Sequence, residues 1–229
     1  MNGKETQLQQ MLTQLRTRVL VMCASVGIAV DEACEALAAG NMGRAGAVVD
    51  GDADINSLEN EIDDMALTLL VRNQPVAQDL RFVVAALRIV IDLERIGDEA
   101  ASIAERTLIL NEPLPEPVME SVQPLMLAAK SLYASAVEAL RSGDSMAALR
   151  LCKSDDETTQ LEVAALHRIM DYFCKEESPE RGGSYLGMHG VLISRALNRI
   201  CRRAANIAEQ TYFIVEGVNM KHRRNEKSC

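Results

Sequence analysis

The sequence predicts an all-α protein of two tandem three-helix bundles, and three observations support that fold class. Aromatic residues make up only 3% of the 229 residues, tryptophan is absent, and glycine and proline lie mostly between helical segments. Six segments with helical periodicity average about 30 residues, a length that packs well in antiparallel bundles. The second half of the chain also repeats the first, which indicates an internal duplication.

Three helices are predicted in the first half of the chain, at residues 6–39, 42–72 and 75–110. In the first of them, Leu8, Leu12 and Leu15 begin a series of apolar residues with helical spacing. Gly40 follows its C-terminus, a position that glycine commonly occupies. Pro75 suits the first turn of the third helix, where a missing N–H costs little.

Three more helices are predicted in the second half, at residues 118–141, 146–175 and 185–217. Asp144 or Ser145 is expected to cap the fifth helix. The linker Asn111–Pro117 carries three prolines and predicts a domain boundary. We therefore expect one domain over 1–112 and another over 113–229. The segment 176–183 is predicted to be a loop and 221–229 a mostly basic tail.

The duplication is visible in the third and sixth predicted helices. Residues 94–107 and 198–211, which lie 104 positions apart, agree at 8 of 14 places. The second and fifth helices align at an offset of 103, where Leu58–Glu59 matches Leu161–Glu162. Each half is thus predicted to hold the same three-helix unit.

Composition and charge restrict the class of protein. A net charge of −9 argues against nucleic acid as the principal ligand. The six cysteines include no CxxC pair and indicate free thiols in a reducing compartment. No secretory signal or membrane-spanning run is visible, so we expect a cytoplasmic protein that meets the membrane only through partners.

Acidic residues occupy an unexpected place on the third helix. At about 100° per residue, Leu80, Val84, Leu87 and Ile91 share an arc that is expected to face the core. The next residues on that arc are Glu94, Asp98 and Glu105. Because unpaired buried carboxylates are costly, these acids are expected to meet a cation, a proton or water.

Metal binding is one interpretation of these acids. Glu94 and Asp98 lie one helical turn apart, and the second helix offers Asp52 and Asn56 with the same spacing. Such an oxygen-only set favours magnesium, calcium, manganese or iron over copper or structural zinc. No Glu-x-x-His motif occurs, which argues against a ferritin-like di-iron site. Ion pairs with neighbouring arginines, or a groove open to solvent, would explain the acids as well.

The sequence shows no catalytic machinery. His167, His189 and His222 are isolated, and no Ser-His-Asp set, Cys-His pair or glycine-rich phosphate loop is present. The protein is therefore not expected to be an enzyme.

Three motifs resemble those of the PhoU family of phosphate-signalling regulators. They are QPVAQDLR at 74–81, DLERIGDEA at 92–100 and DGDADIN at 50–56, and the duplicated plan extends the resemblance over nearly the whole chain. The resemblance implies acidic motifs that hold metal ions on an exposed face. Here Glu94, Asp98 and Asp52 match that motif, and Asn56 replaces its second acid with an amide. The expected cofactor is a divalent or trivalent ion such as iron, manganese or magnesium.

The resemblance also implies a function. PhoU-like proteins act as negative regulators of the phosphate-starvation response and connect a phosphate transporter's ATPase subunit with a membrane sensor kinase, without being enzymes. Long amphipathic helices with small residues suggest a homodimer as well. Two other functions stay open: a metal-handling or storage protein, and a transporter accessory protein without kinase contact.

The second repeat departs from the acidic motif. Asn198 and Arg202 stand at the positions of Glu94 and Asp98, and the companion helix keeps one acid, Asp155, followed by Thr159. We therefore predict metal in the first bundle only.

One interpretation is that Arg202 neutralises Asp155 or Glu162 in place of a metal. Arg195, Arg199 and Arg202 would then form a basic stripe. The stripe is expected either to be a solvated face paired with acids of the fifth helix, or to be a docking site for an anion or acidic partner.

Overall fold

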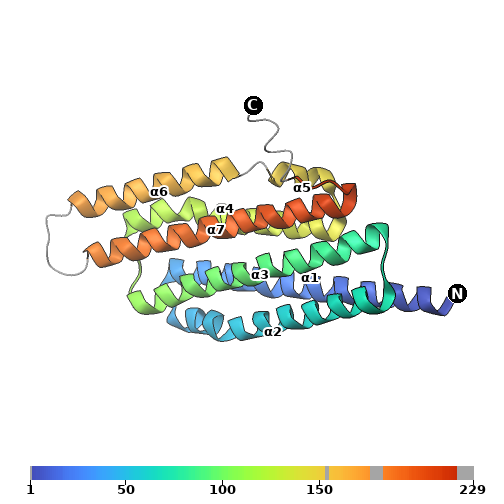
Figure 1. Cartoon of the computed structure of the whole chain (residues 1–229). Coiled ribbons are helices and arrows are strands. Elements are labelled where there is room, and N and C mark those ends of the chain that lie inside the picture. Colours follow the sequence, from blue (N-terminus) through green and yellow to red (C-terminus); the bar gives the residue numbers. More distant parts are fainter. Residues whose placement is uncertain (1, 153–154, 176–182, 221–229) are drawn as a thin grey trace, which may run out of the picture.

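The computed structural model describes residues 2–152, 155–175 and 183–220, and every element within them is an α-helix (Figure 1). The helices are α1 (Asn2–Ala39), α2 (Met42–Asn73), α3 (Ala77–Leu110), α4 (Glu116–Ser142), α5 (Ser145–Leu151), α6 (Asp155–Lys175) and α7 (Gly183–Glu216). Of the loop predicted at 176–183, residues 176–182 lie outside the described residues, and Gly183 begins α7. The basic tail at 221–229 also lies outside them.

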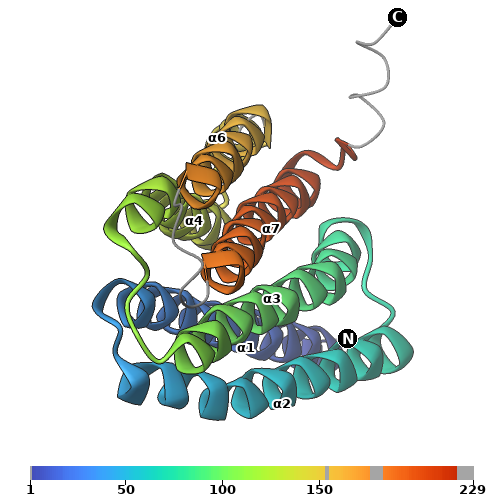
Figure 2. The same ribbon diagram turned by 90° about the vertical axis from the view of Figure 1, so that its left-hand side faces the viewer.

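The helices form two bundles that lie against each other (Figure 2). Helices α1, α2 and α3 contact one another, while α7 packs against α4, α5 and α6. The bundles meet mainly where α3 lies along α7, and also where α1 lies along α4. The prediction of an all-α fold with two tandem bundles is confirmed.

The predicted fifth helix is divided in the structure. The short helix α5 ends before Cys152, and α6 begins at Asp155. Asp144 caps α5 as expected, because its side chain accepts a hydrogen bond from the N–H of Ala147 at 2.9 Å. The sequence Ser-Asp-Asp-Glu at 154–157 is a typical helix start, with acids in the first turn. The prediction of one continuous helix relied on apolar periodicity alone and therefore missed this helix start.

The turn between α2 and α3 also differs from the prediction. Pro75 precedes α3, which begins at Ala77 with Val76 as its N-cap residue. Gln74 ends α2 in the left-handed region at φ 44°, a conformation that commonly terminates helices. Ala77 also has a positive φ of 47°. The turn is therefore tighter and more strained than a simple proline-started helix.

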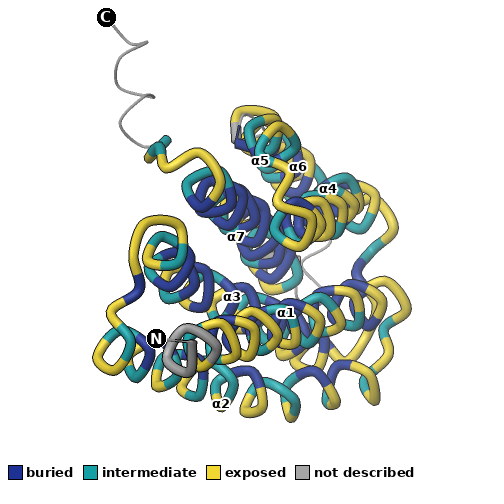
Figure 3. The backbone as a smooth tube through the Cα atoms, turned by 90° about the vertical axis from the view of Figure 1, so that its right-hand side faces the viewer, coloured by how far each residue is buried: buried dark blue, intermediate teal, exposed yellow. Residues whose placement is uncertain are grey.

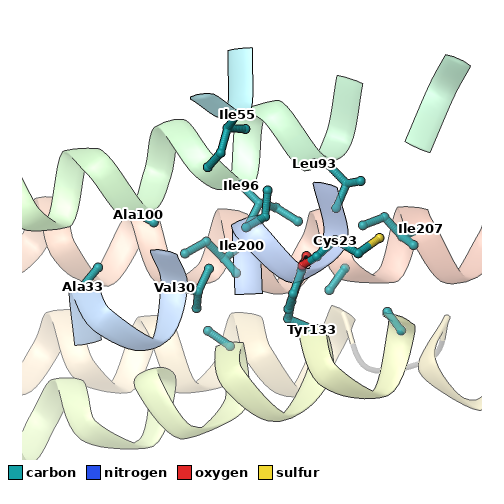
Figure 4. Packing of buried hydrophobic residues seen from close by; sticks show 14 of the residues in the cluster. Cys23, Val30, Ala33, Ile55, Leu93, Ile96, Ala100, Tyr133, Ile200 and Ile207 are labelled. Atoms are coloured by element: carbon teal, nitrogen blue, oxygen red, sulfur yellow. Dashed lines mark hydrogen bonds between the residues drawn. The ribbon is translucent and has the colours of Figure 1, made fainter. Parts of the chain in front are cut away.

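One apolar core continues through both bundles (Figures 3 and 4). Leu93 and Ile96 of α3 are fully buried, as are Ile200 and Ile207 of α7. The predicted boundary near residue 112 falls between α3 and α4, yet apolar side chains pack across the division. The division into two domains therefore stays a prediction.

The apolar arc chosen from the sequence does not face this core. Leu80 is 40% exposed and Ile91 is 45% exposed, so the arc lies at the outer edge of α3. The buried face instead combines large residues with small ones such as Ala86 and Ala100, which allow close approach of neighbouring helices. The expectation that the acids share a core-facing arc was wrong, because it counted only large apolar residues.

Polar contacts form a ladder along the antiparallel pair α3 and α7. Arg81 donates to the carbonyl of Ile214 and Arg88 to the side chain of Gln210. Further along, Asp92 accepts hydrogen bonds from Arg203 and Asn206, at 3.1 and 3.2 Å, and Glu99 pairs with Arg199. These contacts fix the register between the two bundles, because each joins one residue of α3 to one position of α7.

The five described cysteines form no disulfide with one another; four of them are buried and Cys174 is exposed. Burial raises the pKa of both Cys23 and Cys34 to about 12, so these thiols stay protonated and unreactive. Within the described residues, no helix combines the length and hydropathy needed to cross a bilayer.

Which face of α3 is buried can be tested by substituting two isoleucines, one on the buried face and one on the exposed edge. Ile96 is fully buried, and Ile96→Ala should lower the free energy of unfolding by about 2–5 kcal/mol through lost burial and a cavity. Ile91→Ala, at the exposed edge, should cost about 1 kcal/mol or less. Urea unfolding followed by circular dichroism measures both. Equal losses would contradict the assigned facing.

Candidate metal centre

Helices α2 and α3 bring the four predicted ligands onto facing turns. Gly97 makes this possible, because a Cβ at that position would lie 3.1 Å from the side chain of Ile55. The same Cβ would lie 3.7 Å from Oδ1 of Asp52. The α2 pair, Asp52 and Asn56, thus lies beside the α3 turn that carries Glu94 and Asp98.

Two oxygens of this site are buried and have no hydrogen-bond donor. Asn56 donates from Nδ2 to Oδ2 of Asp52 at 3.2 Å, so the amide is oriented by its neighbour one turn away. Oδ1 of Asp52 and Oδ1 of Asn56 are buried without a partner. A buried acceptor without a donor costs about 1–3 kcal/mol. A cation or an ordered water would remove that cost.

The site has an excess of negative charge. Burial, and then the charge of Asp98, raise the pKa of Asp52 and of Glu94. Glu59 belongs to the same cluster: burial raises its pKa first, followed by the charges of Asp63 and Asp98. The sequence reasoning missed Glu59, although it follows Asp52 by seven residues and so lies on the same helical face.

A groove of about 490 Å³ opens beside the acids. Its lining is Glu59, Ile91, Glu94, Arg95, Asp98, Glu99 and Arg203. Arg203 comes from α7, so the second bundle supplies one wall of a site whose acids belong to the first. The alternative of a solvent-open groove therefore describes the position of Glu94 and Asp98 correctly.

The neighbouring arginines leave the central acids without an ion pair. Arg95 lies close enough to lower the pKa of Glu94 partly, against the larger effects that raise it. Arg88 instead donates to Gln210 and lies over the ring of Phe213. Among the described residues, no ion pair joins an arginine or lysine to Glu94 or Asp98.

The donor set suits a hard cation, although it is not arranged as a closed cage. In the described part of the chain, no three or more His, Cys, Asp or Glu side chains are positioned to hold a metal ion. The two unpartnered oxygens and the mutually repelling carboxylates are nevertheless the groups that oxygen-binding cations satisfy. Metal binding by Asp52, Asn56, Glu94 and Asp98 stays a prediction.

In the second bundle, a hydrogen bond takes the place of the repulsion between carboxylates. Glu162 is the counterpart of Glu59, and Asn198, which is 6% exposed, is the counterpart of Glu94. Nδ2 of Asn198 donates a hydrogen bond to the carboxylate of Glu162. The amide thus replaces a repelling carboxylate with a donor.

Arg202 does not take the role predicted for it toward Glu162. It is exposed, whereas Glu162 is hydrogen-bonded to Asn198. Its other predicted partner, Asp155, has a side chain outside the described part of the chain. Arg199 of the basic stripe forms its ion pair with Glu99 of α3 and so joins the bundles, while the charge of Glu162 acts on it as a smaller effect.

The electrostatic conflict at the first site predicts a pH dependence. Because Asp52, Glu59 and Glu94 have raised pKa values, the folded protein binds protons more tightly than the unfolded chain. Stability should therefore fall as the pH rises from the ordinary carboxyl pKa of about 4 through the raised values.

Asp98→Asn removes one of the charges that raise these pKa values. We expect the metal-free variant to gain about 0.2–0.5 kcal/mol at neutral pH, the cost of one like-charge pair at this spacing. Its stability should also fall less with rising pH. Urea unfolding of metal-free protein at several pH values checks both points, and a variant less stable than the parent at neutral pH would contradict them.

Comparisons with known proteins agree with this architecture. The PhoU domain family model matches residues 19–107 and 124–211, one segment in each half. The chain is 32% identical to the phosphate-specific transport system accessory protein PhoU homolog of Pseudomonas aeruginosa, over 92% of this chain and 86% of that protein. It is 30% identical to PhoU homolog 1 of Thermotoga maritima, over 92% and 89%.

Solved structures give the same result. The crystal structure of PhoU from Pseudomonas aeruginosa superposes with a TM-score of 0.86 at 30% identity and covers 92% of this chain and 99% of that one. The phosphate transport system regulatory protein PhoU from Streptococcus pneumoniae gives 0.83 at 26% identity, over 93% and 98%. The chain belongs to the PhoU domain family.

Proposed function

We propose that this protein is a non-enzymatic accessory protein of a phosphate-specific transport system and regulates the response to phosphate supply. The observation that carries the proposal is similarity over nearly the whole chain to proteins named as accessory proteins of that system. Both bundles take part in the similarity. The function is therefore assigned to the two-bundle unit and not to a single shared motif.

The first bundle is the part that binds a cation in this proposal. Asp52 and Asn56 would provide oxygens from α2, while Glu94 and Asp98 would provide them from α3. Glu59 adds negative charge beside them and favours occupancy by a cation such as iron, manganese or magnesium. When bound, the ion would offset the carboxylate repulsion and present a positive centre to oxygen ligands.

The resemblance of the motifs supports an adaptor role. The partners are then a phosphate transporter's ATPase subunit and a membrane sensor kinase. The protein would be a cytoplasmic homodimer that meets the membrane only through these partners. The groove supports contact with partners, because it is open and carries charges from both bundles. A partner that binds there would contact the acids of α3 and Arg203 of α7 together.

Storage of metal is a weaker alternative. Storage requires many ions for each chain, and the second copy of the motif has already satisfied its acid with Asn198. The observation favours one regulatory ion over a reservoir.

Metal content tests the site directly. Glu94→Ala combined with Asp98→Ala should abolish a bound metal, because it removes both carboxylates that α3 would contribute to the metal site. Glu116→Ala with Glu120→Ala is a matched control, since it removes an exposed acidic pair of the same spacing from α4. Elemental analysis of purified protein gives metal per chain. Equal metal content in the parent and the Glu94/Asp98 variant would refute the assignment.

Phosphate-responsive transcription tests the regulatory role. Deleting the gene should activate phosphate-starvation transcription at high phosphate, and the intact gene should restore repression. A reporter fusion measures this in the host. Normal repression in the deletion strain would exclude the regulator and leave a transporter accessory function, which phosphate uptake would then examine.

A further inference from the structure

The last position in the series of polar contacts between α3 and α7 differs from the others. Going toward the C-terminus of α3, the partners on α7 move steadily toward its N-terminus, from Ile214 to Arg203 and then Arg199. Continuing this antiparallel register brings Arg106 of α3 opposite His189 of α7. The earlier contacts join a hydrogen-bond donor to an acceptor, whereas this position places the guanidinium of Arg106 beside the imidazole of His189.

His189 is a buried polar side chain without hydrogen bonds. It is 3% exposed, and both ring nitrogens are buried without a partner. A neutral imidazole carries one N–H donor and one acceptor nitrogen, so both are left unsatisfied. Its ring packs edge-on against Tyr185, with centroids 4.5 Å apart, and Tyr185 is half exposed. The histidine therefore lies directly beneath the surface.

Arg106 is a partly buried cation that no acid of the described residues neutralises. Its Nε is buried and has no acceptor. The neighbouring Glu105 acts on Asp52, which shows that this acid lies toward α2 while Arg106 lies toward α7. Burial, and then the charge of Arg106, lower the pKa of His189, which agrees with the proximity that the register gives.

We propose that Arg106 and His189 form a binding site for a small inorganic oxyanion at the seam between the bundles. The anion would accept hydrogen bonds from Nε of Arg106 and from a ring N–H of His189. It would thereby satisfy two buried donors and neutralise the arginine.

This site is separate from the acidic groove. Asp98 and Arg106 are eight residues apart on α3, which corresponds to about 12 Å along the helix axis. The acids face α2 and the groove, whereas Arg106 faces α7. Anion binding at this seam is therefore independent of whether the first bundle holds a metal.

Titration calorimetry of the full chain with sodium phosphate tests the proposal. Sodium sulfate in a parallel titration separates a general oxyanion site from one selective for phosphate, with chloride keeping the ionic strength constant. We expect saturable binding of at least one of the two anions. Arg106→Gln should weaken it about tenfold or more, because a charged hydrogen bond in a buried site is lost.

A matched variant controls for the loss of one positive charge. Arg168→Gln removes an exposed arginine of α6 and should leave the affinity unchanged. Nitrogen-15 spectra of the histidine rings add a local measurement: the anion should shift the His189 signals, identified by their loss in His189→Asn, in the parent but not in Arg106→Gln. Asp98→Asn should retain the anion response even if it loses metal.

Three results would overturn the proposal. The first is the absence of saturable binding of either anion to the parent protein. The second is equal binding by the parent and by Arg106→Gln, with circular dichroism showing that the variant is folded. The third is equal weakening of binding by Arg168→Gln and Arg106→Gln, which would show a nonspecific charge effect.

Discussion

The structure depends on the packing of α3 against three other helices. It contacts α1 and α2 within its own bundle and α7 across the seam, and its small and large apolar residues are buried against them. Glu94 and Asp98 lie on the edge of α3 that faces the groove. The close approach of α2 at Gly97 then brings Asp52 to the same edge. The acids therefore lie close together, because the other faces of α3 pack against neighbouring helices.

The two copies of the motif resolve that crowding differently. In the first bundle Glu59 and Glu94 are both carboxylates, and their pKa values are raised, first by burial and then by neighbouring acids. In the second bundle the equivalent pair is Glu162 and Asn198, joined by a hydrogen bond. One amide in place of a carboxylate replaces repulsion with a hydrogen bond to the remaining carboxylate. In the first copy, Oδ1 of Asp52 and Oδ1 of Asn56 are buried without a donor beside these carboxylates.

The sequence predicted the helices and the facing acidic turns because both follow from local patterns. Periodicity located the long helices, and the spacing of Asp52, Asn56, Glu94 and Asp98 gave the candidate site. It did not predict which side of α3 is buried, because burial of small residues such as Ala86 depends on which helices approach. The break before α6 was missed for the opposite reason: a local start signal lay inside an otherwise continuous pattern.

The contacts between the two bundles could not be predicted from the spacing of residues in the sequence. Nothing in the spacing shows that Arg199 pairs with Glu99, or that Arg203 reaches the groove, because those contacts depend on the register of α3 against α7. That register also decides which side chains line the groove. Glu99 and Arg203 line the same groove as Glu94 and Asp98, while Glu99 pairs with Arg199 and Arg203 pairs with Asp92 across the seam. Side chains that hold the two bundles together are therefore also part of the groove wall.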